Sequence, residues 1–304
     1  MHSHLHAALS TNPHDFFLNK SISPQIRNIT ARLKDQPSLV VQERIDKLEY
    51  LEDLSQRLAG ETQKWRDALP FNFPSSNINF PILHLILSSL NYTDKALAKD
   101  VSRGLPIVGP VAPTEVFKQK HTPQSLTIDV WLDQTDARNR RIIKQLCKPK
   151  DFKLATQCWA KSMDELSKNW ITTPAEITDD VLREIPLTPR FAIREQHGLG
   201  PEKIRLIDDC KISDLNKTLE LFETSVPDSL NVALSMARTH SLTWRQLTLQ
   251  LVIVDFSHAY KHIGIDQGRQ FYAHIALLSP TGIPMHCKLN TQPFWELKSP
   301  RKLG

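Results

Sequence analysis

A carboxylate and an aromatic residue near the end of an apolar run are the first candidates for chemistry in this sequence. Asp255 follows the apolar residues LVIV in the segment LVIVDF, and Tyr260 lies five positions after Asp255. A buried strand that ends in a carboxylate delivers this group to the edge of a sheet, where it could hold Mg²⁺, a hard cation that prefers oxygen ligands. The position also suits a carboxylate that caps a turn, and the pattern taken alone favours that role.

A second group lies in the segment EKIRLIDDCKISDLN, residues 202–216. Lys203 and Arg205 alternate with apolar residues, so both would project from one face of a strand. Two cations at this spacing can grip a triphosphate, and Asp208 and Asp209 would orient or neutralise them. An exposed edge strand with local ion pairs explains the same residues equally well.

Basic residues also gather in the first half of residues 136–169, where the apolar spacing predicts helix. They could follow the phosphates of a nucleic acid or form a solvated helix face. These residues are Arg138, Arg140, Arg141, Lys144, Lys148, Lys150 and Lys153.

Histidines and cysteines give weaker signals. His258 and His262 have the i, i+4 spacing of a helical metal site, but no third ligand follows at a recognisable spacing. Cys210 and Cys287 are interpreted as packed thiols, because no partnered base is evident. The four cysteines are too widely spread for a zinc knuckle or a disulfide framework, which favours a reducing compartment, the cytosol or the nucleus.

Composition indicates a soluble globular protein with one large or two modest domains. The chain has 304 residues, of which 40% are hydrophobic and 23% charged. The net charge of +5 fits a polyanionic partner such as nucleic acid, and also many ordinary proteins. We find neither a secretory signal nor an apolar segment long enough to span a membrane.

Helices are expected before residue 175 and strands after it. An amphipathic pattern predicts a long helix over 37–69, and 217–247 also looks mostly helical. Shorter helices are predicted at 82–90 and 95–104, the second ending at Gly104. The predicted strands include PRFAI, KIRLIDD and LQLVIVDF, and a hairpin in which SPTG joins QFYAHIALL to IPMHCKL.

The order of these motifs resembles a reverse transcriptase. KIRLIDDCKISDLN is similar to the fingers motif, LVIVDFSHAYKHIGI to the palm motif with the first catalytic aspartate, and TQPFW to the Pro-Phe-Gly motif. The likeness is to the reverse-transcriptase-like proteins of dinoflagellate-type protist retroelements, or retrotransposons. It extends upstream, because YTDKALAKDVSRGLPIVGPV and CWAKSMDELSKNWITTPAE are similar to stretches ahead of the polymerase, so that it covers roughly residues 80–295.

The resemblance implies an RNA-directed DNA polymerase that uses two metal ions for nucleotidyl transfer. By this resemblance Asp255 is a catalytic carboxylate that binds Mg²⁺, and Tyr260 packs under the incoming sugar and excludes a ribose hydroxyl. Lys203 and Arg205, with Asp208 and Asp209, form the triphosphate site. The implied partners are an RNA or DNA template–primer and a deoxynucleotide.

The chain also departs from the family pattern. Trp295 stands where the family has glycine, and the Tyr-x-Asp-Asp hairpin with the second acidic pair is missing before Gly304. We therefore expect a truncated, inactive polymerase fragment in which Mg²⁺ binding, as it occurs in the complete parent enzyme, is weak or absent. A non-catalytic nucleic-acid-binding protein and a structural relic without activity are the alternatives.

The expected fold class is α+β. A disordered segment at 1–35 precedes a mainly helical region at 36–174, and an incomplete right-hand polymerase fingers and palm with an antiparallel sheet follows at 175–304.

Overall fold

The computed structural model describes residues 24–69, 78–196, 202–224 and 259–293. The chain forms two compact units, and each is considered by itself. The first consists of Met1–Arg57 with Ser225–Asp255, and the second of Leu58–Thr224 with Phe256–Gly304. The domain boundary predicted near residue 175 falls inside the second unit, since helices before it pack against strands after it.

The described part of the first unit consists of two helices in contact, α3 (Pro24–Asp35) and α4 (Pro37–Arg57). An ion pair between Arg32 and Glu43 joins them. The first helix occupies the end of the segment predicted to be disordered. The long helix predicted over 37–69 is two helices, because the backbone at Leu58, with φ −90° and ψ 8°, leaves helical geometry.

The second unit begins with α5 (Ala59–Ala68), α6 (Phe80–Ser89) and α7 (Leu97–Arg103). The predicted end of α7 at Gly104 is confirmed, and it has a steric reason. Gly104 has φ +90°, and a Cβ there would lie 2.5 Å from the backbone carbon of Ile265. Only glycine allows Leu105 to form its parallel bridge with Ile265 at this distance.

Four helices follow the first strands, and side-chain caps fix the starts of three of them. Thr127, Asp151 and Thr178 each accept a hydrogen bond from the backbone N–H three residues later. They cap α8 (Ile128–Asp133), α10 (Phe152–Ser167) and α11 (Asp179–Glu184), while α9 (Thr135–Leu146) begins two residues after α8 ends.

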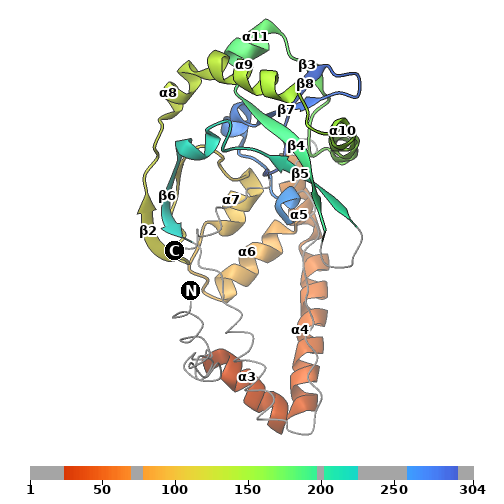
Figure 1. The fold of residues 1–304 in the computed structure, drawn as a ribbon. Helices are drawn as coiled ribbons and strands as arrows, with labels where there is room; N and C mark the ends of the chain where they lie inside the picture. Colours follow the sequence, from red (N-terminus) through yellow and green to blue (C-terminus); the bar gives the residue numbers. More distant parts are fainter. Residues whose placement is uncertain (1–23, 70–77, 197–201, 225–258, 294–304) are drawn as a thin grey trace, which may run out of the picture. The chain divides into compact units, whose positions relative to one another are not determined.

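The larger sheet of the second unit has five strands in the order β3-β8-β7-β4-β5 (Figure 1). These are β3 (Ala175–Glu176), β4 (Leu187–Glu195), β5 (Lys203–Asp208), β7 (His274–Leu278) and β8 (Pro284–Lys288). The sheet is mixed, not antiparallel as predicted, because β4 and β7 pair in parallel. Two parallel strands need a long connection between them, because the chain must return to the same end of the sheet before the second strand begins. The sequence between β4 and β7 is long enough for this return.

The predicted hairpin of β7 and β8 is confirmed, including its turn. Gly282 has φ +83°, and its N–H donates to the Ser279 carbonyl. The prediction was too long at its start, since residues Gln267–Tyr272 form the 3₁₀ helix η4 instead of a strand.

A smaller sheet has the order β1-β6-β2. Its strands are β1 (Gly109–Val111), β2 (Lys118–Thr122) and β6 (Leu219–Thr224). The helix predicted for 217–247 is therefore wrong at its start, where the 3₁₀ helix η2 (Leu215–Thr218) leads into a strand. The rest of that prediction, with the predicted strand LQLVIVDF, lies outside the described residues.

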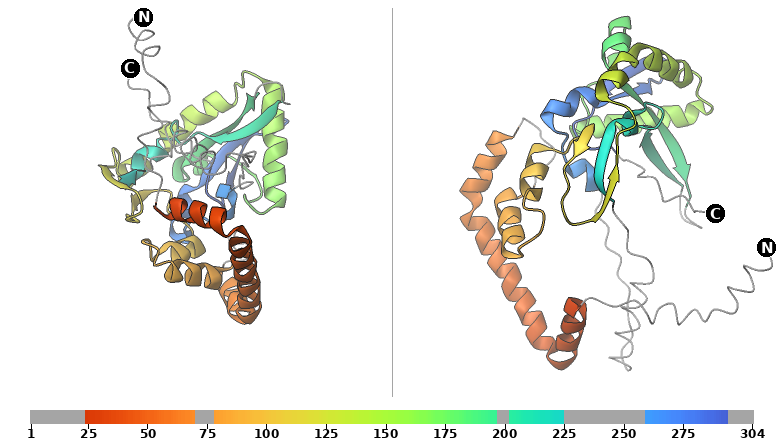
Figure 2. Two further views of the ribbon diagram at one scale, coloured as in Figure 1. Left: turned by 90° about the horizontal axis from the view of Figure 1, so that it is seen from below. Right: turned by 90° about the vertical axis from the view of Figure 1, so that its left-hand side faces the viewer.

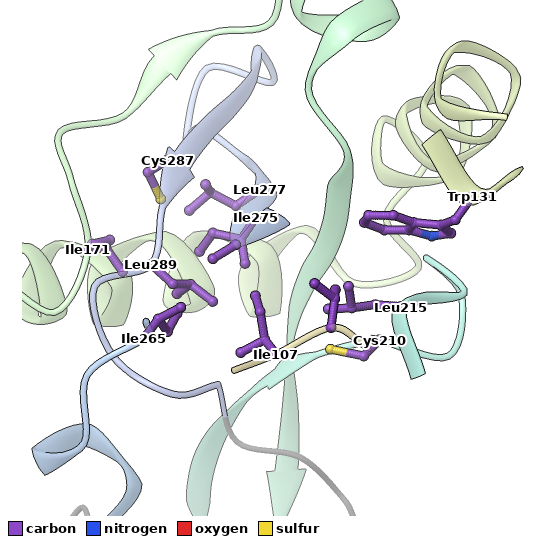
Figure 3. Close-up of a cluster of buried hydrophobic side chains, with 12 residues drawn as sticks. Ile107, Trp131, Ile171, Cys210, Leu215, Ile265, Ile275, Leu277, Cys287 and Leu289 are labelled. Carbon is purple, nitrogen blue, oxygen red and sulfur yellow. The ribbon is translucent and has the colours of Figure 1, made fainter. Parts of the chain in front are cut away.

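The main core of the second unit lies against one face of the larger sheet (Figure 3). Ile275, Leu277 and Cys287 enter it from the β7–β8 hairpin, and Ile265 and Trp131 enter it from outside the sheet. The α+β class is thus confirmed. Within the described part of the chain, no helix is long and apolar enough to cross a membrane.

Candidate nucleotide and nucleic-acid interface

The β4–β5 hairpin extends beyond the rest of its sheet. Residues Leu187–Pro189 of β4 pair with β7, whereas Arg190–Glu195 pair only with β5, in a regular antiparallel register. Helix α10 packs along both strands of the hairpin (Figure 2). The predicted cationic strand KIRLID is therefore the edge strand of a sheet and half of a hairpin that projects from it.

Lys203 and Arg205 lie on the same side of β5, as their alternation predicted. Lys203 is exposed and Arg205 is partly exposed. Glu195 lies directly opposite Lys203 on β4, and its carboxylate forms an ion pair with Arg205. The hairpin therefore presents two cations together with one carboxylate, not a pair of isolated cations.

Asp208 does not orient Lys203 or Arg205, as the sequence predicted, but binds Arg190. The two residues are cross-strand partners, and the Arg190 guanidinium donates to both carboxylate oxygens, at 2.6 and 2.9 Å. Asp208 follows Lys203 by five positions and Arg205 by three, both odd numbers. Its side chain therefore lies on the opposite face of β5, out of their reach.

Asp209 also has a local role instead of the predicted one. Its side chain accepts hydrogen bonds from the backbone N–H groups of Lys211 and Ile212, at 3.1 and 3.0 Å. This geometry caps the turn that follows β5.

The Arg190–Asp208 pair belongs to a buried network of four charges. Arg190 Nη1 donates to Glu165 on α10 at 2.6 Å, and the other oxygen of Glu165 lies 3.0 Å from Lys261 Nζ. Lys261 belongs to the 3₁₀ helix η3 (Ala259–His262), which lies within the predicted palm motif. Two cations and two carboxylates balance in charge, which a site this deeply buried requires.

The pKa values of the central pair reflect this balance. Burial alone would lower the pKa of Arg190, but the charges of Asp208 and Glu165 outweigh it and raise this pKa well above its usual value. Burial would raise the pKa of Asp208, but the charge of Arg190 and its hydrogen bonds lower it instead. Both groups therefore stay ionised in the folded protein.

Arg190, Glu165 and Lys261 were not identified from the sequence as members of a charge network. Arg190 interrupts the apolar pattern of LTPRFAI, and a cation inside a strand that is otherwise buried calls for a charged partner. That signal was present, but its partners lie 25 and 18 residues away along the chain.

The two remaining polymerase-motif residues cannot be placed beside this network. Asp255 lies outside the described residues. Tyr260 lies within η3, but its side chain is likewise outside the described part. Their roles as catalytic carboxylate and sugar-packing aromatic stay predictions.

The basic residues between Arg138 and Lys153 divide into two groups. Arg138 is 4% exposed and stacks on Trp131, at 4.6 Å from the ring centre, and burial lowers its pKa to about 10. Arg140 pairs with Asp136 and Asp179. The lysines after them are exposed and could meet phosphates: Lys144, Lys148, Lys150 and Lys153.

The buried thiols are unsuited to nucleophilic chemistry. Burial raises the pKa of Cys287 to about 12 and that of Cys210 well above its usual value. Neither thiol therefore forms a thiolate at neutral pH, in agreement with their interpretation as packing residues.

The residues that the structure describes contain no group of three or more His, Cys, Asp or Glu side chains able to hold a metal ion. The expected Mg²⁺ ligand, Asp255, is not among them. No protein-family model matches the chain, and no curated protein matches it either.

Proposed function

We propose that this chain is the fingers and first palm segment of a retroelement reverse transcriptase, which binds a deoxynucleotide and a nucleic-acid template–primer. The proposal takes the motif order in the sequence as its starting point. The structural observation that supports it most is the charge network that joins Lys261 to the base of the β4–β5 hairpin.

This network matters because a polymerase must hold two distant segments in register. Asp208 ends the strand that carries Lys203 and Arg205, and Lys261 comes six residues after Asp255 and one after Tyr260. Glu165 and Arg190 bridge the two through contacts of 2.6 to 3.0 Å. The end of the palm motif is thereby fixed beside the end of the cationic strand.

In this proposal each segment has a separate task. Lys203 and Arg205 bind the triphosphate, Arg by its planar fork and Lys as a point charge. Tyr260 would pack against the sugar, and Asp255 would hold Mg²⁺ in the complete parent enzyme. There the ion would neutralise charge on the phosphates during attack by a primer 3′-hydroxyl. The exposed lysines Lys144, Lys148, Lys150 and Lys153 contact the template–primer backbone.

Nucleotide binding tests the proposal. Calorimetric titration with Mg²⁺ and dATP should show binding to the wild-type protein and a loss of about tenfold or more in affinity for Lys203→Ala/Arg205→Ala, since each charge-assisted contact contributes about 1.5–3 kcal/mol. Lys47→Ala/Arg57→Ala removes the same charge from α4 and serves as the matched control. Equal affinity of the two double variants would contradict the proposal.

A further inference from the structure

His274 and His286 bring two imidazole nitrogens together on the β7–β8 hairpin. Their Nδ1 atoms lie 3.4 Å apart, and their ring centres 5.5 Å. In the register of the hairpin Ala276 is opposite His286, so that the two histidines are diagonal neighbours on one face. Both side chains are partly buried.

We propose that this histidine pair binds Zn²⁺. Two nitrogens bound to one tetrahedral zinc at about 2.0–2.1 Å each lie about 3.3–3.4 Å apart. The separation of the two Nδ1 atoms matches this value. Zinc would replace the hydrogen bond between the two rings, and water would complete its coordination.

The hairpin holds the pair in place from its other face. Ile275 and Leu277 are fully buried beside the histidines, and Cys287 is 2% exposed. Because these neighbours anchor both strands in the core, little conformational entropy is lost when zinc binds. Each ring would bind zinc through Nδ1 and carry its proton on Nε2, so neutral imidazoles release no net proton.

Lys288 opposes cation binding at this site. It lies directly across from His274 on β8, close enough for its charge to act on that ring. A nearby cation weakens binding of a dication, so that Lys288→Gln should tighten it. The proposal is independent of the polymerase function, because it uses none of the residues assigned to the nucleotide or to Mg²⁺.

Calorimetric titration with ZnCl₂ tests this proposal. The starting protein should carry His2→Asn/His4→Asn/His6→Asn, which removes the N-terminal histidines as competing ligands. In this background, His274→Asn or His286→Asn should weaken zinc binding by about tenfold or more, since loss of even supporting groups costs about 10–100-fold. Lys288→Gln should strengthen it, and His84→Asn and His121→Asn, both at exposed sites, should leave it unchanged.

Thermal unfolding with and without zinc separates loss of the site from loss of the fold. Zinc should raise the midpoint of the background protein but not of His286→Asn, provided that circular dichroism shows the variant folded. Zinc affinity that is the same in His286→Asn as in the background would overturn the proposal. A loss of affinity in His262→Asn instead would overturn it as well.

Discussion

Arg190 faces Asp208 directly across the β4–β5 hairpin, and its guanidinium holds both oxygens of that carboxylate. The same guanidinium bonds Glu165, whose other oxygen contacts Lys261. One side chain thus connects both strands of the hairpin to α10 and, through Glu165, to the segment predicted as the palm motif.

Arg190→Met should destabilise the protein strongly. It leaves Asp208 and Glu165 buried without their main cation, and breaking a buried pair in this way costs about 3–5 kcal/mol. Urea unfolding measures the change in the free energy of unfolding.

Arg138→Met is the control, because Arg138 is the other arginine that is buried among the described residues. Among the described residues, no acceptor bonds Arg138 Nε or Nη1. The lost cation–π contact, about 0.5–2 kcal/mol, is offset by the removal of unsatisfied donors, which cost about 1–3 kcal/mol each. Equal destabilisation by the two substitutions would mean that the charge network adds no special stability.

Acid should weaken the fold through Asp208. Its pKa is lower in the folded protein than in the unfolded chain, so its contribution is complete above about pH 4, the usual aspartate value. The contribution is lost as the pH falls from there through the lower pKa of the folded state. Urea unfolding between pH 7 and pH 3 should show this decline, with a shallower decline for Asp208→Asn. Parallel curves for the two proteins would rule out this role.

Glu195→Gln should strengthen nucleotide binding. The substitution releases Arg205 from its ion pair, and exposed pairs are worth up to about 1 kcal/mol, which corresponds to an affinity gain of about two- to fivefold. Glu202→Gln is the matched control. It removes the same charge from the hairpin, but Glu202 pairs with Arg194 and not with Arg205. If both variants bind Mg²⁺ and dATP equally well, only the net charge matters.

The exposed lysines between residues 144 and 153 should set the salt dependence of template–primer binding. Lys144→Ala/Lys148→Ala removes two phosphate contacts, so the slope of log affinity against log salt should become shallower by about 1.8 for a duplex. Fluorescence anisotropy at several salt concentrations gives the slope. An unchanged slope, equal to that of Lys47→Ala/Arg57→Ala, would identify these lysines as part of a solvated surface.

Local patterns predicted the elements whose signals lie close together in sequence. The β7–β8 hairpin has its turn residues between two apolar runs, and the end of α7 has a glycine that no other residue can replace. The strand character of KIRLID followed from its alternation. These signals depend on neighbours within about ten residues.

The parallel pairing of β4 with β7 could not be predicted in the same way, because its partners lie far apart in the chain. The role of Asp208 was misjudged for the same reason, since Arg190, 18 residues upstream, decided what Asp208 does. The partners of Asp209 are local, the N–H groups of Lys211 and Ile212, so its role as a turn cap was within reach of the sequence.

Discrimination between dATP and ATP tests the central claim most directly, because it depends on Tyr260 beside a nucleotide held by Lys203 and Arg205. Calorimetry with Mg²⁺ should show tighter binding of dATP than of ATP to the wild-type protein. Tyr260→Val should narrow this difference, Tyr50→Val should leave it unchanged, and Lys203→Ala/Arg205→Ala should weaken both nucleotides alike. Equal binding of dATP and ATP by the wild-type protein, or no binding of either, would contradict the account.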